Sequence, residues 1–326
     1  MSEKKKENTP RKKEIWKKIR GFLAMVMVAV ISIAGTLAYL STKSDKKINT
    51  FTATENIKLD LEEPDFDPEE DGKDYQPDKE IAKNPQLLNI TADDSSEWVI
   101  MRIDYLVEDQ GEKPATKYKT VTYDDITANN ETSDKWEGAN IKGLIDFDKD
   151  KATGTVKGIN SDKNWFRLTA AQAQAYFDQA DNNEKPTYDA LAGQKCEYFI
   201  YKCALSGEEN IVSGDNLSTA TVANPAATTI TGSKTTPLFN KVTIKEQKQI
   251  VQNGWNLDDL PDFQIVAVGG AIKNLDDGVE IADKKLVLPA DGAVATDATT
   301  KKIIKGLISL LVTENPDLNY GVDSQP

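Results

Sequence analysis

The clearest strand pattern in the chain lies between residues 99 and 107. One face of this stretch carries Val99, Met101, Ile103, Tyr105 and Val107, and the other carries Ile100, Arg102, Asp104 and Leu106. A period of two places successive side chains on opposite faces of a β-strand. We therefore predict a strand with one apolar face and one mixed face.

Two shorter alternations precede this strand. Residues 49–54 interleave threonines with apolar side chains, and residues 57–62 alternate aliphatic with charged ones. Both patterns predict half-buried strands. The following stretch, 62–85, is rich in proline and acidic residues, so we expect loop over most of its length.

Further apolar runs predict the rest of the sheet. Residues 198–205 are apolar on both faces and predict a central strand, and residues 238–244 and 263–268 predict two more. Two segments favour helix. The first, 169–180, begins at a potential capping threonine, and we expect it on the surface as an insertion. The second, 300–312, has a helical apolar stripe that predicts a core-facing helix and is made of Ile303, Ile304, Leu307, Ile308, Leu310 and Leu311.

Many strands divided by polar loops, with few helices, predict a mainly β fold. We expect an antiparallel β-sandwich with helical insertions and a short C-terminal helix. Polar and mixed sequence places loop or helix insertions around 108–190 and 206–234.

The first 38 residues have the order of an export signal. A basic region, 1–20, holds nine Lys/Arg and precedes an apolar region, 21–38. Small residues near Ala38 favour cleavage between Ala38 and Tyr39. The uncharged run extends to Leu40 and is long enough to span a bilayer, so a retained membrane anchor is the alternative.

Composition narrows the classes of function. The chain has 40 basic and 53 acidic residues. Nine of the basic and three of the acidic ones lie before Tyr39, so the exported part keeps 31 basic and 50 acidic residues and has a net charge of about −19. Such a charge disfavours binding to nucleic acid. The chain has no His, which removes the commonest zinc ligand and the commonest general base. The odd spacing of Cys196 and Cys203 predicts opposite faces of one strand and no disulfide between them.

The order of these segments resembles the TasA and camelysin family of exported matrix proteins from Gram-positive bacteria. The residues that carry the resemblance are Gly35-Thr36-Leu37-Ala38-Tyr39-Leu40-Ser41, Asn49-Thr50-Phe51-Thr52-Ala53, Glu63-Pro64, Tyr198-Phe199-Ile200-Tyr201, Thr236-Pro237-Leu238-Phe239-Asn240-Lys241-Val242, Phe263-Gln264-Ile265-Val266-Ala267-Val268 and Ala271-Ile272. Leu40 and Lys273 depart from the family pattern, in which an aromatic residue and Gln are usual. The resemblance implies a jelly-roll sandwich, secretion, cleavage by a SipW-type signal peptidase and, in some members, assembly into extracellular fibres of a biofilm.

Fibre assembly has a physical route in this chain. Cleavage frees an N-terminal segment with strand character that can pair with an open sheet edge of another subunit. The predicted assembly strand comprises Asn49, Phe51, Ile57, Leu59 and Leu61. The alternative is that this strand pairs within its own domain. The expected partners are therefore copies of this chain or other matrix subunits, together with the signal peptidase, and the membrane is involved only through an uncleaved signal.

Other activities have weaker sequence support. Asp146, Asp148 and Asp150 are spaced like the start of a calcium loop, but Lys151 and Lys157 replace the glycine and glutamate of an EF-hand, so only a looser calcium site is conceivable. A camelysin-like metallopeptidase is an alternative function, yet no His-Glu-x-x-His motif is present. A membrane-anchored surface adhesin or accessory protein is the third candidate. We expect a secreted structural protein of the extracellular matrix, with no catalytic residues and no required cofactor.

Overall fold

The fold is described from a computed structural model that covers residues 59–66, 76–91, 95–108, 118–123, 141–177, 191, 194–207, 220–253, 255, 257, 260, 263–276, 279–280 and 284–312. The expected signal peptide with its cleavage site at Ala38 and Tyr39 lies outside these residues. Three members of the predicted assembly strand, Asn49, Phe51 and Ile57, also lie outside them.

The described elements are mostly short strands, with two strands of more than ten residues and one helix of fifteen residues. The strands are β1 (Leu59–Glu62), β2 (Glu80–Ala82), β3 (Gln86–Asn89), β4 (Glu97–Glu108), β5 (Tyr118–Val121), β6 (Ile145–Phe147), β7 (Trp165–Thr169), β8 (Glu197–Tyr201), β9 (Lys241–Ile244), β10 (Phe263–Lys273), β11 (Leu275–Asp276) and β12 (Val279–Glu280). The helices are η1 (Ile141–Gly143), α2 (Ala170–Gln174), α3 (Gln247–Gln252) and α4 (Ala298–Val312).

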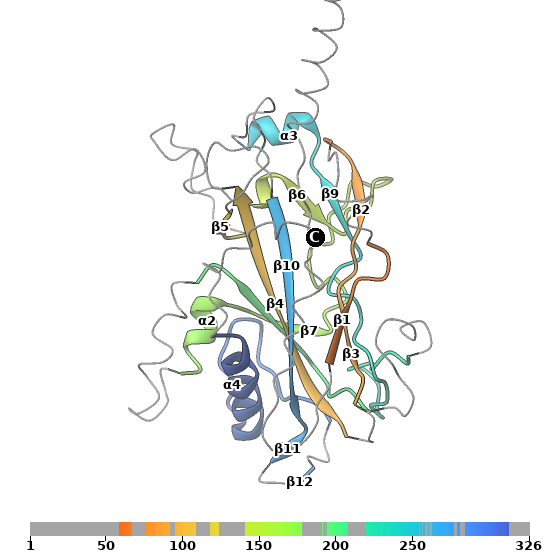
Figure 1. The fold of residues 1–326 in the computed structure, drawn as a ribbon, viewed down its shortest axis with the longest axis vertical. Helices are drawn as coiled ribbons and strands as arrows, with labels where there is room; N and C mark the ends of the chain where they lie inside the picture. Colours follow the sequence, from red (N-terminus) through yellow and green to blue (C-terminus); the bar gives the residue numbers. More distant parts are fainter. Residues whose placement is uncertain are drawn as a thin grey trace, which may run out of the picture.

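The first layer is a five-stranded antiparallel sheet in the order β10-β4-β8-β7, with β5 also paired to β4. The pairing of β4 with β10 extends from Phe263↔Val107 to Lys273↔Glu97, and these two strands run through the middle of the molecule (Figure 1). β4 pairs with β10 along one side and with β8 and β5 along most of the other, so it lies in the interior of the sheet.

The second layer is built around one long antiparallel pairing between residues 80–89 and 233–244. At one end β2 pairs with β9, and at the other the backbone N–H of Asn89 donates to Ser233 O (2.8 Å). Between these points the N–H of Leu238 donates to Pro85 O (3.0 Å). Pro85 and Pro237 have no N–H to donate, which explains why β2 and β3 are separate strands. With β1 on β3 and β6 on β9, this layer completes a jelly-roll-like sandwich.

The alternation predicted for residues 99–107 is confirmed by the two hydrophobic cores. Val99, Met101, Ile103, Tyr105 and Val107 belong to the core between the two layers. Trp98, Ile100 and Leu106 point to the opposite face, which α4 and α2 cover. Figure 1 shows α4 and α2 on the same side of the long strands, away from β1 and β3. The mainly β, antiparallel fold predicted from the sequence is confirmed, and so is its short C-terminal helix.

Two adjacent glycines of β10 allow β1 and β3 on one face, and α4 on the other, to approach this strand closely. A Cβ on Gly269 would lie 2.6 Å from Leu87 Cδ2 of β3, and a Cβ on Gly270 would lie 3.3 Å from Leu311 Cδ2 of α4. Glycine inside a strand commonly marks such a close approach. This pair therefore fixes how closely β1–β3 and α4 pack on the two faces of β10.

The segment 169–180 is a correction to the sequence prediction. Thr169 does cap the helix, in a capping box with Gln172, but α2 ends at Gln174. We expected this segment on the surface as an insertion, whereas Tyr176 and Phe177 are 1% exposed and belong to the core beneath α4. Apolar burial outweighs the polar composition of the rest of the segment.

The region around 108–190, in which loop or helix insertions are predicted, also contributes short strands. Its described part contains β6, which joins the second layer, and β7, which closes one edge of the first sheet. Both are short, so alternation over their few residues gives a weak signal.

The two cysteines lie on opposite faces of the sheet, as their spacing predicts. Cys196 belongs to the core under the helices and Cys203 to the core between the layers, and both are free thiols. Burial raises the pKa of each thiol to about 12. A buried neutral thiol is a poor nucleophile, so both behave as small apolar side chains.

Candidate functional site

The described end of the predicted assembly strand pairs with its own chain. Leu59 lies opposite Asn89 and Leu61 opposite Leu87 in the β1–β3 ladder. Leu59 is buried in the inter-layer core, and Leu61 packs partly buried against it. In the single chain these two leucines thus help to close the sandwich.

Among the described strands, β10 forms an edge of the first sheet, and this edge lies next to β1. β10 is the last strand of the first sheet, and no described strand pairs with the outer side of its residues 264–272. β1 borders this edge from the second layer, because a Cβ on Gly269 would lie 3.3 Å from Leu59 Cδ2. β1 therefore begins beside a long strand whose outer side is not paired with any described strand.

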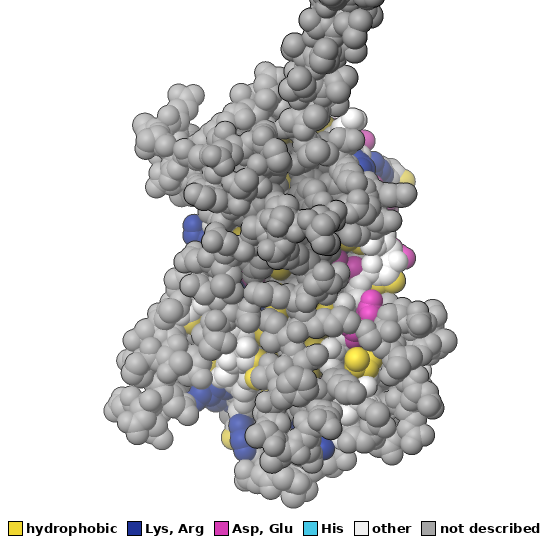
Figure 2. All heavy atoms as spheres, viewed as in Figure 1, with side chains coloured by type: hydrophobic (Ala, Val, Ile, Leu, Met, Phe, Trp, Pro, Cys, Tyr) yellow, Lys and Arg dark blue, Asp and Glu magenta, His cyan; other side chains and the backbone are white. Residues whose placement is uncertain are grey.

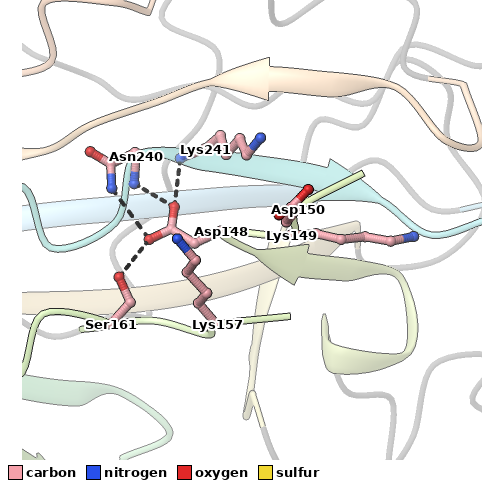
Figure 3. A pocket seen from close by; sticks show the side chains of 7 residues that line it. All are labelled: Asp148, Lys149, Asp150, Lys157, Ser161, Asn240 and Lys241. Atoms are coloured by element: carbon pink, nitrogen blue, oxygen red, sulfur yellow. Dashed lines mark hydrogen bonds between the residues drawn. The ribbon is translucent and has the colours of Figure 1, made fainter. Parts of the chain in front are cut away.

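The acidic motif at 146–150 forms a different kind of site, centred on Asp148. Its carboxylate accepts hydrogen bonds from the backbone N–H groups of Asn240 (2.7 Å) and Lys241 (3.1 Å) and from the hydroxyl of Ser161 (3.1 Å). Figure 3 shows these donors around both oxygens. Asp148 is 5% exposed and has φ 48°, a left-handed conformation that Asp tolerates better than most residues. It ties the loop after β6 to the start of β9.

The other two carboxylates of the motif have separate partners. Asp146 forms an ion pair with Lys245, the next residue after β9. Asp150 accepts from the N–H groups of Ala152 and Thr153, which lowers the pKa of its carboxyl group. In the part of the chain that the structure describes, no group of His, Cys, Asp or Glu is arranged to hold a metal ion. In the structure each of these three carboxylates has partners within the chain.

A pocket of about 310 Å³ opens beside Asp148, and lysines line much of it. Its walls are Asp148, Lys149, Asp150, Lys157, Ser161, Asn240 and Lys241. In Figure 3 the side chains of Lys149 and Lys241 extend away from Asp148, whereas Lys157 extends toward it. Because the ammonium groups diverge, the pocket does not present one cationic centre.

Charges of both signs are mixed on the surrounding surface. Lys241 pairs with Glu80 (2.7 Å), and Lys151 lies 3.6 Å from Asp78. In Figure 2 acidic and basic side chains lie next to each other over the β2 side of the molecule. Exposed pairs of this kind contribute little to stability but they shape local recognition.

Sequence reasoning missed a buried cation near β1. Lys83 is fully buried, and its ammonium lies 2.8 Å from Glu63 Oε1. The available signals were the Glu63-Pro64 turn and a lysine placed between buried strands, but neither reveals the pairing of residues so far apart in sequence.

Comparisons with protein-family models, with curated proteins and with solved structures found no match. Among the described residues, no helix combines the length and the apolarity needed to cross a membrane.

Proposed function

We propose that this chain is a secreted structural protein of an extracellular, biofilm-type matrix, and that it assembles into fibres through its N-terminal strand segment. The observation that carries the proposal is the position of β1 beside the outer edge of β10. β1 begins next to β10, and residues 264–272 of β10 have no described strand partner on that side.

Strand addition supplies the affinity in this proposal. An added strand gains backbone hydrogen bonds to the edge, and alternate side chains fill apolar pockets. Asn49, Phe51 and Ile57 belong to the segment that a second copy would receive. The partners are therefore copies of this chain or other matrix subunits, after a SipW-type peptidase has cut between Ala38 and Tyr39.

The composition fits this role better than an enzymatic one. The mature chain carries a net charge of about −19 and no His, so a metallopeptidase would have to build its metal site from other ligands. The export signal and the resemblance to TasA and camelysin proteins support secretion to the cell surface or matrix. The camelysin-like peptidase and the membrane-anchored adhesin have no structural observation that favours them.

Electron microscopy of the purified mature protein tests the proposal. Residues 39–326 should form fibres, whereas residues 55–326 should stay monomeric with an unchanged circular dichroism spectrum. Residues 39–312, which lack a C-terminal stretch of similar length, serve as the matched control and should still polymerise. Fibres of 55–326 equal to those of 39–326 would contradict the assembly role of the N-terminal segment.

A further inference from the structure

A tight turn after β1 encloses the buried side chain of Lys83. The turn is closed by a hydrogen bond from the Phe66 N–H to Glu63 O (3.1 Å), with Pro64 at its second position. The Lys83 ammonium lies 2.8 Å and 2.9 Å from the two carboxylate oxygens of Glu63. The ring of Phe66 covers the same ammonium at 4.3 Å from its centroid. We call residues 59–66 together with Lys83 and Asn84 the β1 clamp.

Asn84 makes a second contact with the turn, next to the contact between Lys83 and Glu63. Asn84 accepts from the backbone N–H of Asp65 (3.0 Å) and donates to the Asp65 carboxylate (2.8 Å). Lys83 and Asn84 lie between β2 and β3, where the N–H of Lys83 donates to Asn240 O (3.2 Å). The turn after β1 is thus attached to the centre of the second layer and not only to its edge.

The clamp depends on mutual burial of opposite charges. Burial lowers the pKa of Lys83, and the carboxylate of Glu63 opposes that shift. Removing one partner of a buried pair leaves an uncompensated charge, which is far more costly than losing an exposed pair. If β1 and its turn left the subunit, Lys83 would lose Glu63 and Phe66, and Leu59 would leave the inter-layer core.

We infer that the β1 clamp keeps β1 in its own subunit, so that the segment donated to a second copy ends before Leu59. This inference rests on the proposed function and assigns the boundary between donated and retained chain. Residues 39–58 extend to about 66 Å as a strand, whereas the nine positions of the β10 edge need about 30 Å. The donated segment can therefore cover the edge and still leave a linker to the clamp.

The ladder β1–β3 provides a direct test, because Glu62 lies opposite Gln86. The test protein is residues 39–326 with Glu62→Cys and Gln86→Cys, in a background where Cys196→Ala and Cys203→Ala remove the native thiols. Facing positions of an antiparallel pair lie within disulfide reach. Fibres are grown under reducing conditions, oxidised, dissolved in denaturant and analysed without reductant.

The expected product is monomer with an internal disulfide. Monomers oxidised before assembly should also polymerise at the rate of the reduced protein. Disulfide-linked oligomers, or loss of assembly after locking, would overturn the inference because both show that β1 changes subunit. If the reduced protein and its parent form no fibres, the proposed function fails instead. The internal disulfide in monomers does not depend on that outcome.

A clamp variant provides the second measurement. In residues 55–326, Glu63→Ala should raise the unfolded fraction by roughly a few hundredfold to a few thousandfold, as expected for breaking a buried pair. Glu80→Ala is the matched control because its ion pair with Lys241 is exposed, and it should change that fraction less than about fivefold. Equal effects of the two substitutions would overturn the clamp.

Discussion

At the residue scale, Asp148 shows how a motif typical of cation binding can serve a structural role. Its carboxylate is surrounded by two backbone N–H groups, a hydroxyl and the side-chain amide of Asn240. The sequence indicates an acidic cluster but cannot show that these donors arrive from β9 and from residue 161. The functional interpretation of the motif therefore depends on a tertiary pairing that spacing does not encode.

Replacing Asp148 tests this role. Asp148→Ala should lower the free energy of unfolding by about 3 kcal/mol, because it removes hydrogen bonds to a charged acceptor and leaves the N–H groups of Asn240 and Lys241 without it. Asp148→Asn should cost less, since it keeps one acceptor oxygen and tolerates positive φ. Denaturant unfolding measures both.

Asp150→Ala is the control, because the carboxylate of Asp150 accepts its hydrogen bonds from its own exposed turn. It should change the unfolding midpoint much less than Asp148→Ala. A larger loss from Asp150→Ala would show that the turn, and not the Asp148 contacts, holds this loop.

At the element scale, long regular patterns were predictable and short strands were not. β4 has an apolar face that alternates over residues 99–107, and α4 carries a complete helical stripe, so one face of each is determined locally. β3 has only four residues, all buried, and its partners come from β1 and from residues 233–238. Local sequence cannot specify a pairing between segments about 150 residues apart. The same limit hid the β1 clamp, whose partners are twenty residues apart.

The contact between β3 and β10 leads to a prediction about two adjacent layers. Gly269→Val should destabilise the protein by about 1–3 kcal/mol, because its side chain would overlap Leu87 Cδ2. Leu87→Ala alone should cost about 2–4 kcal/mol by opening a cavity.

The double variant Gly269→Val/Leu87→Ala should lose less than the sum of the two single losses, since the valine fills part of that cavity. A double-mutant cycle in denaturant measures this coupling. Additive losses would mean that the layers do not meet at this position.

At the scale of the whole molecule, both faces of the first sheet are covered, and β10 forms the edge at which we propose that assembly takes place. α4 is held against the first sheet partly by Arg102, which donates to Leu311 O (2.8 Å) and forms a buried pair with Asp104. The opposite side of the sheet is closed by the second layer. The strand addition that we propose would therefore take place at the sheet edge rather than on either face.

The net charge of the chain after the predicted cleavage should oppose the proposed assembly and make it depend on salt. Subunits that each carry about −19 repel one another before an edge and a donated strand can pair. The Debye length falls from about 30 Å at 0.01 M salt to about 10 Å at 0.1 M, which is shorter than the size of the subunit. Assembly of residues 39–326 should accelerate steeply over this range of sodium chloride and then level off, as followed by light scattering.

Magnesium and calcium chloride should act alike at matched ionic strength, because the carboxylates of Asp146, Asp148 and Asp150 already have partners within the chain. A large excess effect of calcium over magnesium would contradict simple screening, and slower assembly at higher salt would show that attraction between opposite charges drives the contact.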